Sequence, residues 1–372
     1  MASHAPRVFL SAGEPSGDLH GGAVVRALRD RLPGISIDAL GGPCVRAAGA
    51  TVRHPMERYT VLGFVEVLGK IPAHVRLLRQ LEREFRAGAY DLALLIDYPG
   101  FNVRVAEAAH RHGVKVLYYI APQLWAWRPG RARKLARAVD RLAAVLPFEP
   151  AFFARHGINA EYVGHPLLDR PALPTRNEAR QRLGIGAAER VLGLFPGSRP
   201  QETARLWAPF RDAARRLRAL GACERVLVAG TADGGYPGSE GFQLHRGASE
   251  DVFAAADVAL AKSGTTTLEA AVADLPMVVA YRVHPLTSWL ARRLITVPWI
   301  SLVNLVADAP VVPELTQGSV TPERLVEAAT PLLDPAHPKT LGQREGLRLV
   351  RERLGGGGAA GRVAALAAEL LG

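Results

Sequence analysis

The sequence has only two cysteines, Cys44 and Cys223, among its 372 residues. They lie far apart and lack metal-ligand spacing, which argues against a disulfide framework and against a zinc site. No run of about 18 apolar residues occurs, so no segment is expected to span a bilayer. The first residues, MASHAPRVFL, lack the charged and apolar regions of a secretion signal. We therefore expect a protein of a reducing compartment, the cytoplasm.

Acidic residues are also scarce relative to basic ones, which gives a formal net charge of +11 and a pI of about 10.1. This surplus favours anionic partners such as nucleic acid, anionic lipid or phosphorylated substrates, although an arginine-rich composition alone would produce it. The arginines are dispersed and no RNA-binding motif is visible, which disfavours nucleic acid. Hydrophobic residues make up 48%, enough for a sizeable core.

Strand-like apolar runs alternate with helical segments in both halves of the chain, a pattern typical of parallel βαβ units. In the first half, strands are predicted at Arg7–Ala12, Ile35–Leu40, Asp91–Asp97, Lys115–Ile120 and Arg141–Leu146. In the second half, they are predicted at Arg190–Phe195, Glu224–Ala229, Gly241–Leu244, Val258–Ala261 and Met277–Tyr281. The expected fold class is α/β, with two Rossmann-like domains facing across a cleft.

Domain boundaries follow from composition. Three prolines in residues 164–175 predict a linker, so residues 1–168 form the first domain and residues 175–340 the second. Residues 341–372 are expected to form C-terminal helices that pack back on the first domain or on a partner subunit. A homodimer is one of the assemblies that the sequence leaves open.

The first candidate site follows two strands of the first half. SAGEPSGD, residues 11–18, supplies Gly13 and Gly17 for close backbone approach and Ser16 or Asp18 for capping the next helix. The apolar strand before Pro99 ends in a carboxylate, Asp97. Ligands bind outside the carboxyl ends of such strands, so Asp97 is a candidate general base. A helix-capping Asp is the structural alternative, and Glu14, Asp18 and His20 are rival bases.

The second candidate site follows two strands of the second half. In LGLFPGSRPQE, residues 192–202, Gly197 and Ser198 come just before Arg199, which offers a bidentate fork to phosphate. In AKSGTTTLEAA, residues 261–271, small residues and hydroxyls open a helix and suit an anion, and Glu269 could accept ribose hydroxyls. The spacing differs from a P-loop, so a nucleotide sugar fits better than a nucleoside triphosphate.

Taken together, these motifs resemble the lipid-A-disaccharide synthases, glycosyltransferase family 19 with the two-domain GT-B fold. The resemblance extends from about Phe9 to Gln317. It rests on SAGEPSGDLHG, GFVEVLGKIP, DYPGFN, YYIAPQLWAWRPGR, VGHPLLD, LFPGSR, KSGTTTLEAA and ISLVN…PELTQ. Two features depart from the family pattern: Val303 stands where proline is usual, and ADAPVVPE replaces a commoner segment.

The resemblance implies an inverting transfer of 2,3-diacylglucosamine from UDP to the 6-hydroxyl of 2,3-diacylglucosamine 1-phosphate, without a cofactor or metal. It implies that Asp97 is the base and that the first loop faces the acceptor, through Gly13, Glu14, Ser16, Gly17 and Asp18. It assigns to the UDP-sugar Gly197, Ser198, Arg199, Ser263, Gly264, Thr265, Thr266, Thr267, Glu269, Asn304, Glu314 and Gln317.

Because both substrates carry acyl chains, a peripheral contact with the inner face of the membrane is expected. Residues 61–71, VLGFVEVLGKI, are apolar on nearly every face, and Phe64, Val67 and Leu68 are the expected docking residues. Basic residues lie close by, at Lys70, Arg76, Arg79 and Arg83. A buried structural helix is the alternative. The following segment places Leu77, Leu78, Leu81 and Phe85 on one helical face, which predicts core packing.

Two further features have both structural and functional interpretations. Arg133, Arg137 and Arg141 are expected to stack at helical spacing and to face an anion or solvent. Trp125 and Trp127 could stack on sugar or anchor at an interface, with at least one of them buried because alternate positions of an extended chain face opposite sides.

Three alternative functions remain open at this point. One is another UDP-sugar enzyme of the same fold, such as a peptidoglycan glycosyltransferase or a 2-epimerase, which would not need the apolar GFVEVLG segment. The others are a nucleic-acid-binding protein and a lipid-binding protein without catalytic activity.

Overall fold

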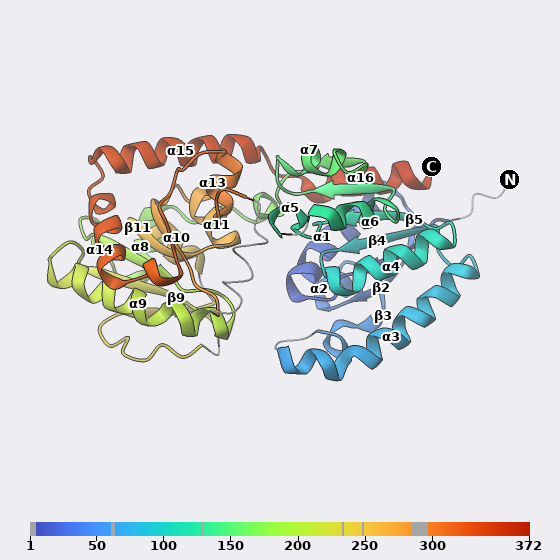
Figure 1. The fold of residues 1–372 in the computed structure, drawn as a ribbon, viewed down its shortest axis with the longest axis horizontal. Helices are drawn as coiled ribbons and strands as arrows, with labels where there is room; N and C mark the ends of the chain where they lie inside the picture. Colours follow the sequence, from blue (N-terminus) through green and yellow to red (C-terminus); the bar gives the residue numbers. More distant parts are fainter. Residues whose placement is uncertain (1–4, 61–63, 128, 233, 248, 285–296) are drawn as a thin grey trace. The chain divides into compact units, whose positions relative to one another are not determined.

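The computed structural model describes residues 5–60, 64–127, 129–232, 234–247, 249–284 and 297–372, and of residues 64–68 it describes the backbone only. The chain forms two compact units (Figure 1). Unit 1 comprises residues 1–170 and 356–372, and unit 2 comprises residues 171–355. Each unit is built around one parallel sheet.

Unit 1 contains a seven-stranded sheet in the order β3-β2-β1-β4-β5-β6-β7. Its strands are β1 (Arg7–Ser11), β2 (Ser36–Gly41), β3 (Thr51–Pro55), β4 (Leu92–Ile96), β5 (Lys115–Tyr119), β6 (Arg141–Ala144) and β7 (Ala160–Tyr162). Its helices are α1 (Pro15–Arg31), α2 (Pro43–Ala47), α3 (Phe64–Arg86), α4 (Pro99–Arg111), α5 (Leu124–Trp127), α6 (Ala132–Ala136), α7 (Glu149–Ala154) and α16 (Ala359–Leu371). All five residues of β4 are buried, as expected of a strand covered on both faces.

Unit 2 contains a six-stranded sheet in the order β10-β9-β8-β11-β12-β13. Its strands are β8 (Val191–Phe195), β9 (Arg225–Gly230), β10 (Gln243–Arg246), β11 (Val258–Lys262), β12 (Met277–Tyr281) and β13 (Glu314–Thr316). Its helices are α8 (Arg176–Leu183), α9 (Pro200–Ala219), α10 (Ser249–Ala255), α11 (Thr265–Val272), α13 (Leu302–Ala307), α14 (Pro322–Ala329) and α15 (Pro338–Leu354).

The predicted α/β class with two Rossmann-like domains is confirmed by these two parallel sheets. The strands that the sequence missed are β3, β7 and β13, which lie at sheet edges. β7 and β13 have three residues each, and none of the residues of the three strands is fully buried. Edge strands therefore lack the apolar runs that identify the central strands.

The C-terminal helices do not act as one element. α15 belongs to unit 2, whereas α16 belongs to unit 1 and packs against α1. The Asp169 carboxylate accepts the backbone N–H groups of Gly358, Ala359 and Ala360 at 2.5–3.1 Å. A carboxylate at a helix N-terminus satisfies amides that have no partner within the helix. Asp169 thereby attaches the last helix to the rest of unit 1.

Helix α3 buries most of the face that the sequence predicted, with Leu78 partly buried against the core. Leu77, Leu81 and Phe85 are at most 2% exposed and belong to the core of unit 1. The expected docking residues Phe64, Val67 and Leu68 have side chains outside the described residues. Within the part of the chain that the structure describes, we find no helix with the length and apolar character needed to cross a bilayer.

The predicted arginine stack is wrong. Helix α6 ends at Ala136, and Arg141 begins β6, so Arg133, Arg137 and Arg141 do not share one helical face. Arg141 instead pairs with Glu369 of α16 at 2.5 Å. The helix cannot continue to Arg141, because the chain enters the sheet as β6 at that residue.

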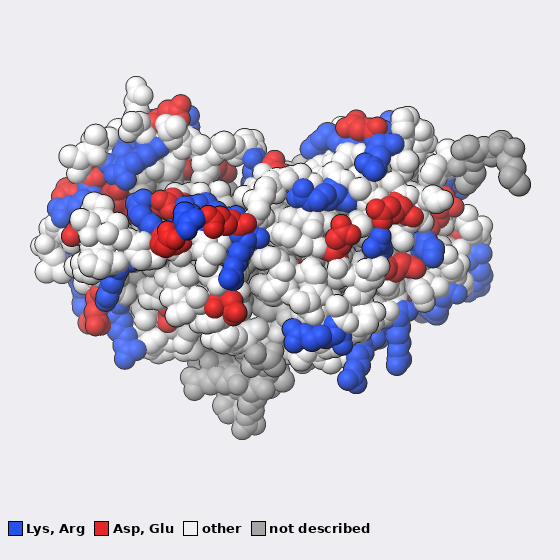
Figure 2. Space-filling view, turned by 90° about the horizontal axis from the view of Figure 1, so that it is seen from above, with Lys and Arg blue, Asp and Glu red and all other residues white. Residues whose placement is uncertain are grey.

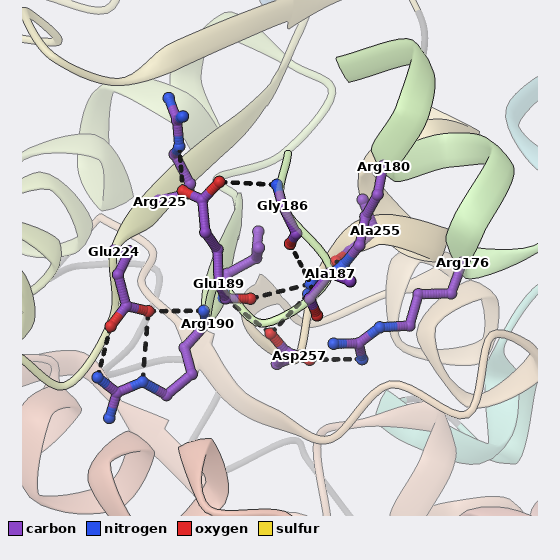
Figure 3. A network of polar contacts seen from close by, with 11 residues as sticks. Arg176, Arg180, Gly186, Ala187, Glu189, Arg190, Glu224, Arg225, Ala255 and Asp257 are labelled. Carbon is purple, nitrogen blue, oxygen red and sulfur yellow. Dashed lines mark hydrogen bonds and ion pairs between the residues drawn. The ribbon is translucent and has the colours of Figure 1, made fainter. Parts of the chain in front are cut away.

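Many other arginines serve the fold. In unit 2, a network surrounds Arg180, which is 2% exposed (Figure 3). Its guanidinium donates to the Asp257 carboxylate at 2.9 Å and to the carbonyls of Gly186, Ala187, Glu189 and Ala255. Asp257 also accepts the Val191 N–H at 2.8 Å. The network joins the amino ends of β8 and β11.

Surface arginines also have acidic partners. Seen from above, basic and acidic side chains lie side by side over much of unit 2 (Figure 2). Arg344 and Arg351 of α15 both contact Asp274 at 2.9 Å, and Arg348 contacts Glu345 and Glu352 of the same helix. Many of the arginines therefore take part in the fold through acidic partners.

Replacing Arg180 with Met should lower the free energy of unfolding by roughly 3–5 kcal/mol, because four backbone carbonyls would lose their donor and Asp257 would keep only Arg176 as its cation. Urea unfolding measures this loss. Arg182→Met is the matched control on the same helix, since Arg182 is 58% exposed where it pairs with Asp251 and such pairs contribute at most about 1 kcal/mol. Equal losses in both variants would contradict a stabilising role of the buried network.

Candidate active site

The strand order of unit 1 reverses between β1 and β4. From β1 the chain builds β2 and β3 on one side, then returns to place β4 on the other. Loops on the two sides of such a switch point diverge, and ligands bind there, outside the carboxyl ends of the strands. The two loops flanking this switch point are residues 12–14 and residues 97–98, and both motifs predicted from the sequence lie there.

A buried amide joins these two loops. Asn102 of α4 is 0% exposed, and its Oδ1 accepts the Ser11 hydroxyl at 2.6 Å. Its Nδ2 donates to the carbonyls of Ile96 and Asp97 at 3.1 and 2.8 Å. Asn102 therefore holds the end of β4 next to the end of β1. The sequence analysis missed this role because it depends on β1 and β4 being neighbours.

Asp97 has a backbone fixed from three directions. Its N–H donates to the Tyr119 carbonyl at 2.9 Å, and its carbonyl accepts from Tyr118 Oη at 2.9 Å as well as from Asn102. Its φ of 46° lies in the left-handed region, which Asp tolerates better than most residues. The N-cap of α4 is Tyr98, so Asp97 precedes that position. The half-buried Asp97 side chain thus starts from a rigid point at the sheet edge.

Tyr98 fills the space beside the first loop. A Cβ on Gly13 would lie 2.4 Å from the Tyr98 ring, so only glycine fits at that position. The Tyr98 hydroxyl lies 2.6 Å from His74 Nε2 and donates to the Tyr59 carbonyl at 3.1 Å. Burial and then the Glu14 charge raise the pKa of Tyr98 to about 12. Glu14 therefore lies close enough to Tyr98 to act on it electrostatically.

The other acidic and basic groups of the first loop differ in their surroundings. Asp18 is 2% exposed, and its carboxylate accepts the N–H groups of Gly42, Cys44 and Val45 at 2.7–3.1 Å. It stabilises the N-terminus of α2, which gives it a structural role. Burial and the Arg170 charge lower the pKa of His20 to about 4, which makes it a weak base. Ser16 is exposed, and Gly17 is buried.

The two tryptophans lie on a short helix, not on the extended segment assumed from the sequence. Trp125 is 6% exposed and its Nε1 donates to Glu149 at 3.0 Å, whereas Trp127 is 45% exposed. The expectation that at least one of them is buried is confirmed. Glu149 also accepts the N–H groups of Val145 and Leu146, and burial raises its pKa to about 7. Glu149 thereby anchors the short helix α5, which carries both tryptophans.

Unit 2 has its own switch point, between β8 and β11. The loop with Gly197, Ser198 and Arg199 follows β8, and α9 begins directly after it. The loop with Ser263 and Gly264 follows β11, and α11 begins at Thr265. Gly197 and Gly264 have φ values of 123° and 145°, which favour glycine. Ser198, Arg199 and Thr265 are exposed, Thr266 and Glu269 are half-buried, and Thr267 is buried.

An ion pair that the sequence analysis did not name connects the two loops of unit 2. Lys262, the last residue of β11, contacts Glu202 of α9 with 2.9 Å between Nζ and Oε1. Each side chain is about one-fifth exposed. The signal was present in the sequence, because a charged residue ends an apolar strand here as Asp97 follows β4. Within the ranges that the structure describes, no group of three or more His, Cys, Asp or Glu is arranged to hold a metal ion.

Asn304 and Glu314 belong to a second network in unit 2. Glu314 accepts the N–H groups of Ile300 and Ser301 at 2.9 and 2.8 Å and the Asn304 Nδ2 at 2.9 Å. Ser263 Oγ donates to the Ile300 carbonyl at 2.8 Å, so the network reaches the loop after β11. These side chains hold the turn before α13 in place.

Gln317 lies beyond the end of β13, in left-handed backbone with a φ of 51°. Its carbonyl accepts from Arg282 Nε at 3.3 Å and its side-chain Oε1 accepts the Val283 N–H at 3.4 Å. It therefore contacts the segment that follows β12.

Comparison with known proteins identifies the family of this chain. The family model described as lipid-A-disaccharide synthetase matches residues 8–353. The lipid-A-disaccharide synthase of Geobacter metallireducens is 42% identical, over 98% of this chain and 97% of the relative. That of Myxococcus xanthus is 39% identical, over 98% of both chains.

Among solved structures, the UDP-GlcNAc 2-epimerase of Neisseria meningitidis bound to UDP-GlcNAc has a TM-score of 0.67 and 12% identity, covering 98% of this chain and 99% of the other. The glycotransferase of kitacinnamycin has a TM-score of 0.63 and 18% identity, covering 99% and 100%. Both likenesses concern the fold alone. The family match and the extent of identity with the curated relatives show that this chain belongs to the lipid-A-disaccharide synthase family.

Proposed function

We propose that this protein is an inverting glycosyltransferase that moves 2,3-diacylglucosamine from UDP to the 6-hydroxyl of 2,3-diacylglucosamine 1-phosphate. The products are the β-1,6-linked disaccharide 1-phosphate and UDP. One observation supports this most directly: each unit brings two motifs of the family to one switch point, with a carboxylate on unit 1 and cationic groups with helix N-termini on unit 2.

Unit 1 supplies the base. As the acceptor 6-hydroxyl attacks the anomeric carbon, Asp97 takes its proton, which typically accelerates such a step by ~10²–10⁴-fold. The three backbone hydrogen bonds of Asp97 support this role, because a base held in one position loses little entropy on reaching the reactive geometry. Asp18 is engaged by backbone amides and His20 has a low pKa, so Glu14 is the remaining rival in the first loop.

Unit 2 supplies the electrophilic side. The bond between the anomeric carbon and the β-phosphate oxygen breaks, and its electron pair leaves with UDP. Arg199 and the first backbone N–H groups of α9 and α11 stabilise this charge, as preorganised donors do. Asn304 and Glu314 act through the turn that they hold, and the Ser263 hydroxyl connects that turn to the loop after β11.

A UDP-sugar 2-epimerase is the second candidate, since enzymes of that activity share the fold. Their identity of 11–12% is far below the 38–42% shared with the lipid-A-disaccharide synthases. Mass spectrometry of products from UDP-2,3-diacylglucosamine with and without the acceptor, together with NMR of the sugar ring, separates the two functions, because epimerisation at C2 leaves the mass unchanged. A transferase needs both substrates, whereas an epimerase needs only the nucleotide sugar.

We also propose that the start of α3 docks on the membrane surface where both acylated substrates reside. Ile71 is 45% exposed, and Arg76, Arg79 and Arg83 are exposed on the side of α3 away from Leu77 and Leu81. An apolar segment flanked by basic residues suits the interface between acyl chains and anionic headgroups. This surface would bring unit 1 to its lipid acceptor.

Asp97→Asn should lower kcat at least ~100-fold, since the amide cannot accept the proton. The Kd for UDP-sugar and the melting temperature should change little, because the backbone contacts of Asp97 do not depend on its carboxylate. Steady-state kinetics and calorimetry measure these effects, with Asp30→Asn on the exposed side of α1 as the control. A larger loss of kcat in Glu14→Gln than in Asp97→Asn would transfer the role to Glu14.

Arg199→Ala should remove roughly 2–4 kcal/mol of transition-state stabilisation, because the leaving diphosphate loses a charged donor. This loss should appear as a lower kcat/KM for the UDP-sugar. Arg182→Ala, an exposed arginine of the same unit, is the control and should leave kcat/KM unchanged. A fall of less than about threefold in Arg199→Ala would make Arg199 an ordinary surface residue.

Phe64→Glu combined with Leu68→Glu should move the protein from sedimenting vesicles to the supernatant, with the melting temperature retained. Leu220→Glu combined with Leu341→Glu is the matched control, since those leucines are 69% and 55% exposed on unit 2. A cooperative loss of thermal stability in the first variant, with binding retained, would assign Phe64 and Leu68 to the core.

A further inference from the structure

Lys262 lies where the proposed donor site needs positive charge. It ends β11, and a Cβ on Gly264 would lie 3.2 Å from the Lys262 Nζ. The ammonium group is therefore next to the turn from which α11 begins. On its other side, the ammonium contacts Glu202, which belongs to the first turn of α9.

Glu202 is held as closely as Lys262. A Cβ on Gly197 would lie 2.9 Å from Glu202 Oε2, so the carboxylate lies against the turn after β8. Burial, and then the Glu202 charge, raise the pKa of Tyr281 at the end of β12. The ion pair thus lies among the carboxyl ends of three neighbouring strands, β8, β11 and β12.

The electrostatics of this position are unusual for a lysine. The N-terminus of a helix carries a partial positive charge, which disfavours a cation nearby. Here α9 and α11 both begin beside the ammonium, and Arg199 lies in the adjacent turn. Glu202 provides one negative charge against these groups. The net charge of these groups is positive, which suits a ligand with two negative charges, such as a diphosphate.

We infer that Lys262 is a phosphate-binding residue of the donor site and that Glu202 pairs with its ammonium until the phosphate replaces it. The inference rests on the proposed function and extends it to two residues that the family motifs did not assign. In the transfer, the O6–C1 bond forms, the O6 proton goes to Asp97, and the C1–O bond to the β-phosphate breaks with its electrons on UDP. Lys262 keeps its protons and stabilises the departing phosphate by a charge-assisted hydrogen bond.

Calorimetric titration of the full-length protein with UDP and with UMP tests this inference. Lys262→Met should weaken UDP binding at least ~10-fold and UMP binding less than ~threefold, because UMP lacks the β-phosphate that a charge-assisted contact would hold. Lys262→Arg should stay within about threefold of wild type for UDP, since it keeps the charge. Lys339→Met, an exposed lysine of unit 2, is the control and should bind both nucleotides normally.

The direction in which a second substitution changes UDP affinity separates a phosphate-binding role of the ion pair from a purely structural one. Glu202→Gln removes a negative charge beside the diphosphate, so UDP should bind as tightly as to wild type or more tightly. If the ion pair only braces α9 against β11, Glu202→Gln and Lys262→Met should weaken UDP binding equally and lower the melting temperature together.

That result, or a Lys262→Met variant that binds UDP normally, would overturn the inference while leaving the donor site in place. A wild-type protein that binds neither nucleotide would overturn the proposed function itself.

Discussion

The reversal of strand order within each parallel sheet is the constraint on which both candidate sites depend. Between β1 and β4, and again between β8 and β11, the chain leaves adjacent strands in opposite directions. Backbone amides and side chains at those strand ends are consequently not covered by a crossing connection. Because at least four of the five residues of each of these strands are buried, the residues at their ends have well-defined positions. A reaction that needs a fixed base and a fixed anion site can use one such edge for each.

Hydrogen bonding by buried polar groups keeps these edges in shape. Asn102 satisfies carbonyls at the ends of β1 and β4, and Asp18 satisfies three amides at the start of α2. Glu149 and Glu314 do the same for the loop after β6 and the turn before α13. Removing one of these acids would leave two or three buried or part-buried N–H groups without an acceptor, at a cost of up to ~1–3 kcal/mol each. An acid within a family motif is thus as readily a part of the fold as a part of the chemistry.

The sequence predicted the central strands and Asp97 because an apolar run identifies a buried parallel strand, and its last polar residue must emerge at the ligand-binding edge. The same argument applies to Lys262, although the glycine and hydroxyls that follow it are the more familiar signal of an anion site. Asn102 and Glu149 could not have been predicted in this way, because their partners lie up to 91 residues away and depend on which strands are neighbours. The prediction of an arginine stack was wrong because it extended helical spacing across the start of β6. The edge strands β3, β7 and β13 were not predicted because they lack a buried apolar pattern.

Ion pairs at the opposite edge of the unit 2 sheet, away from the proposed donor site, have a different role. At the amino ends of β8 and β11, Arg180 and Asp257 form a largely buried pair whose remaining hydrogen-bonding groups are used by backbone carbonyls, an amide and Arg176. At the carboxyl ends, Lys262 and Glu202 form a pair that is one-fifth exposed and lies against two glycine turns. A fully satisfied pair has no remaining capacity for a ligand, whereas a partly exposed pair beside two helix N-termini can exchange one partner for a phosphate. The chemical context of each ion pair, more than its distance, therefore separates arginines and lysines that hold the fold from those that take part in binding.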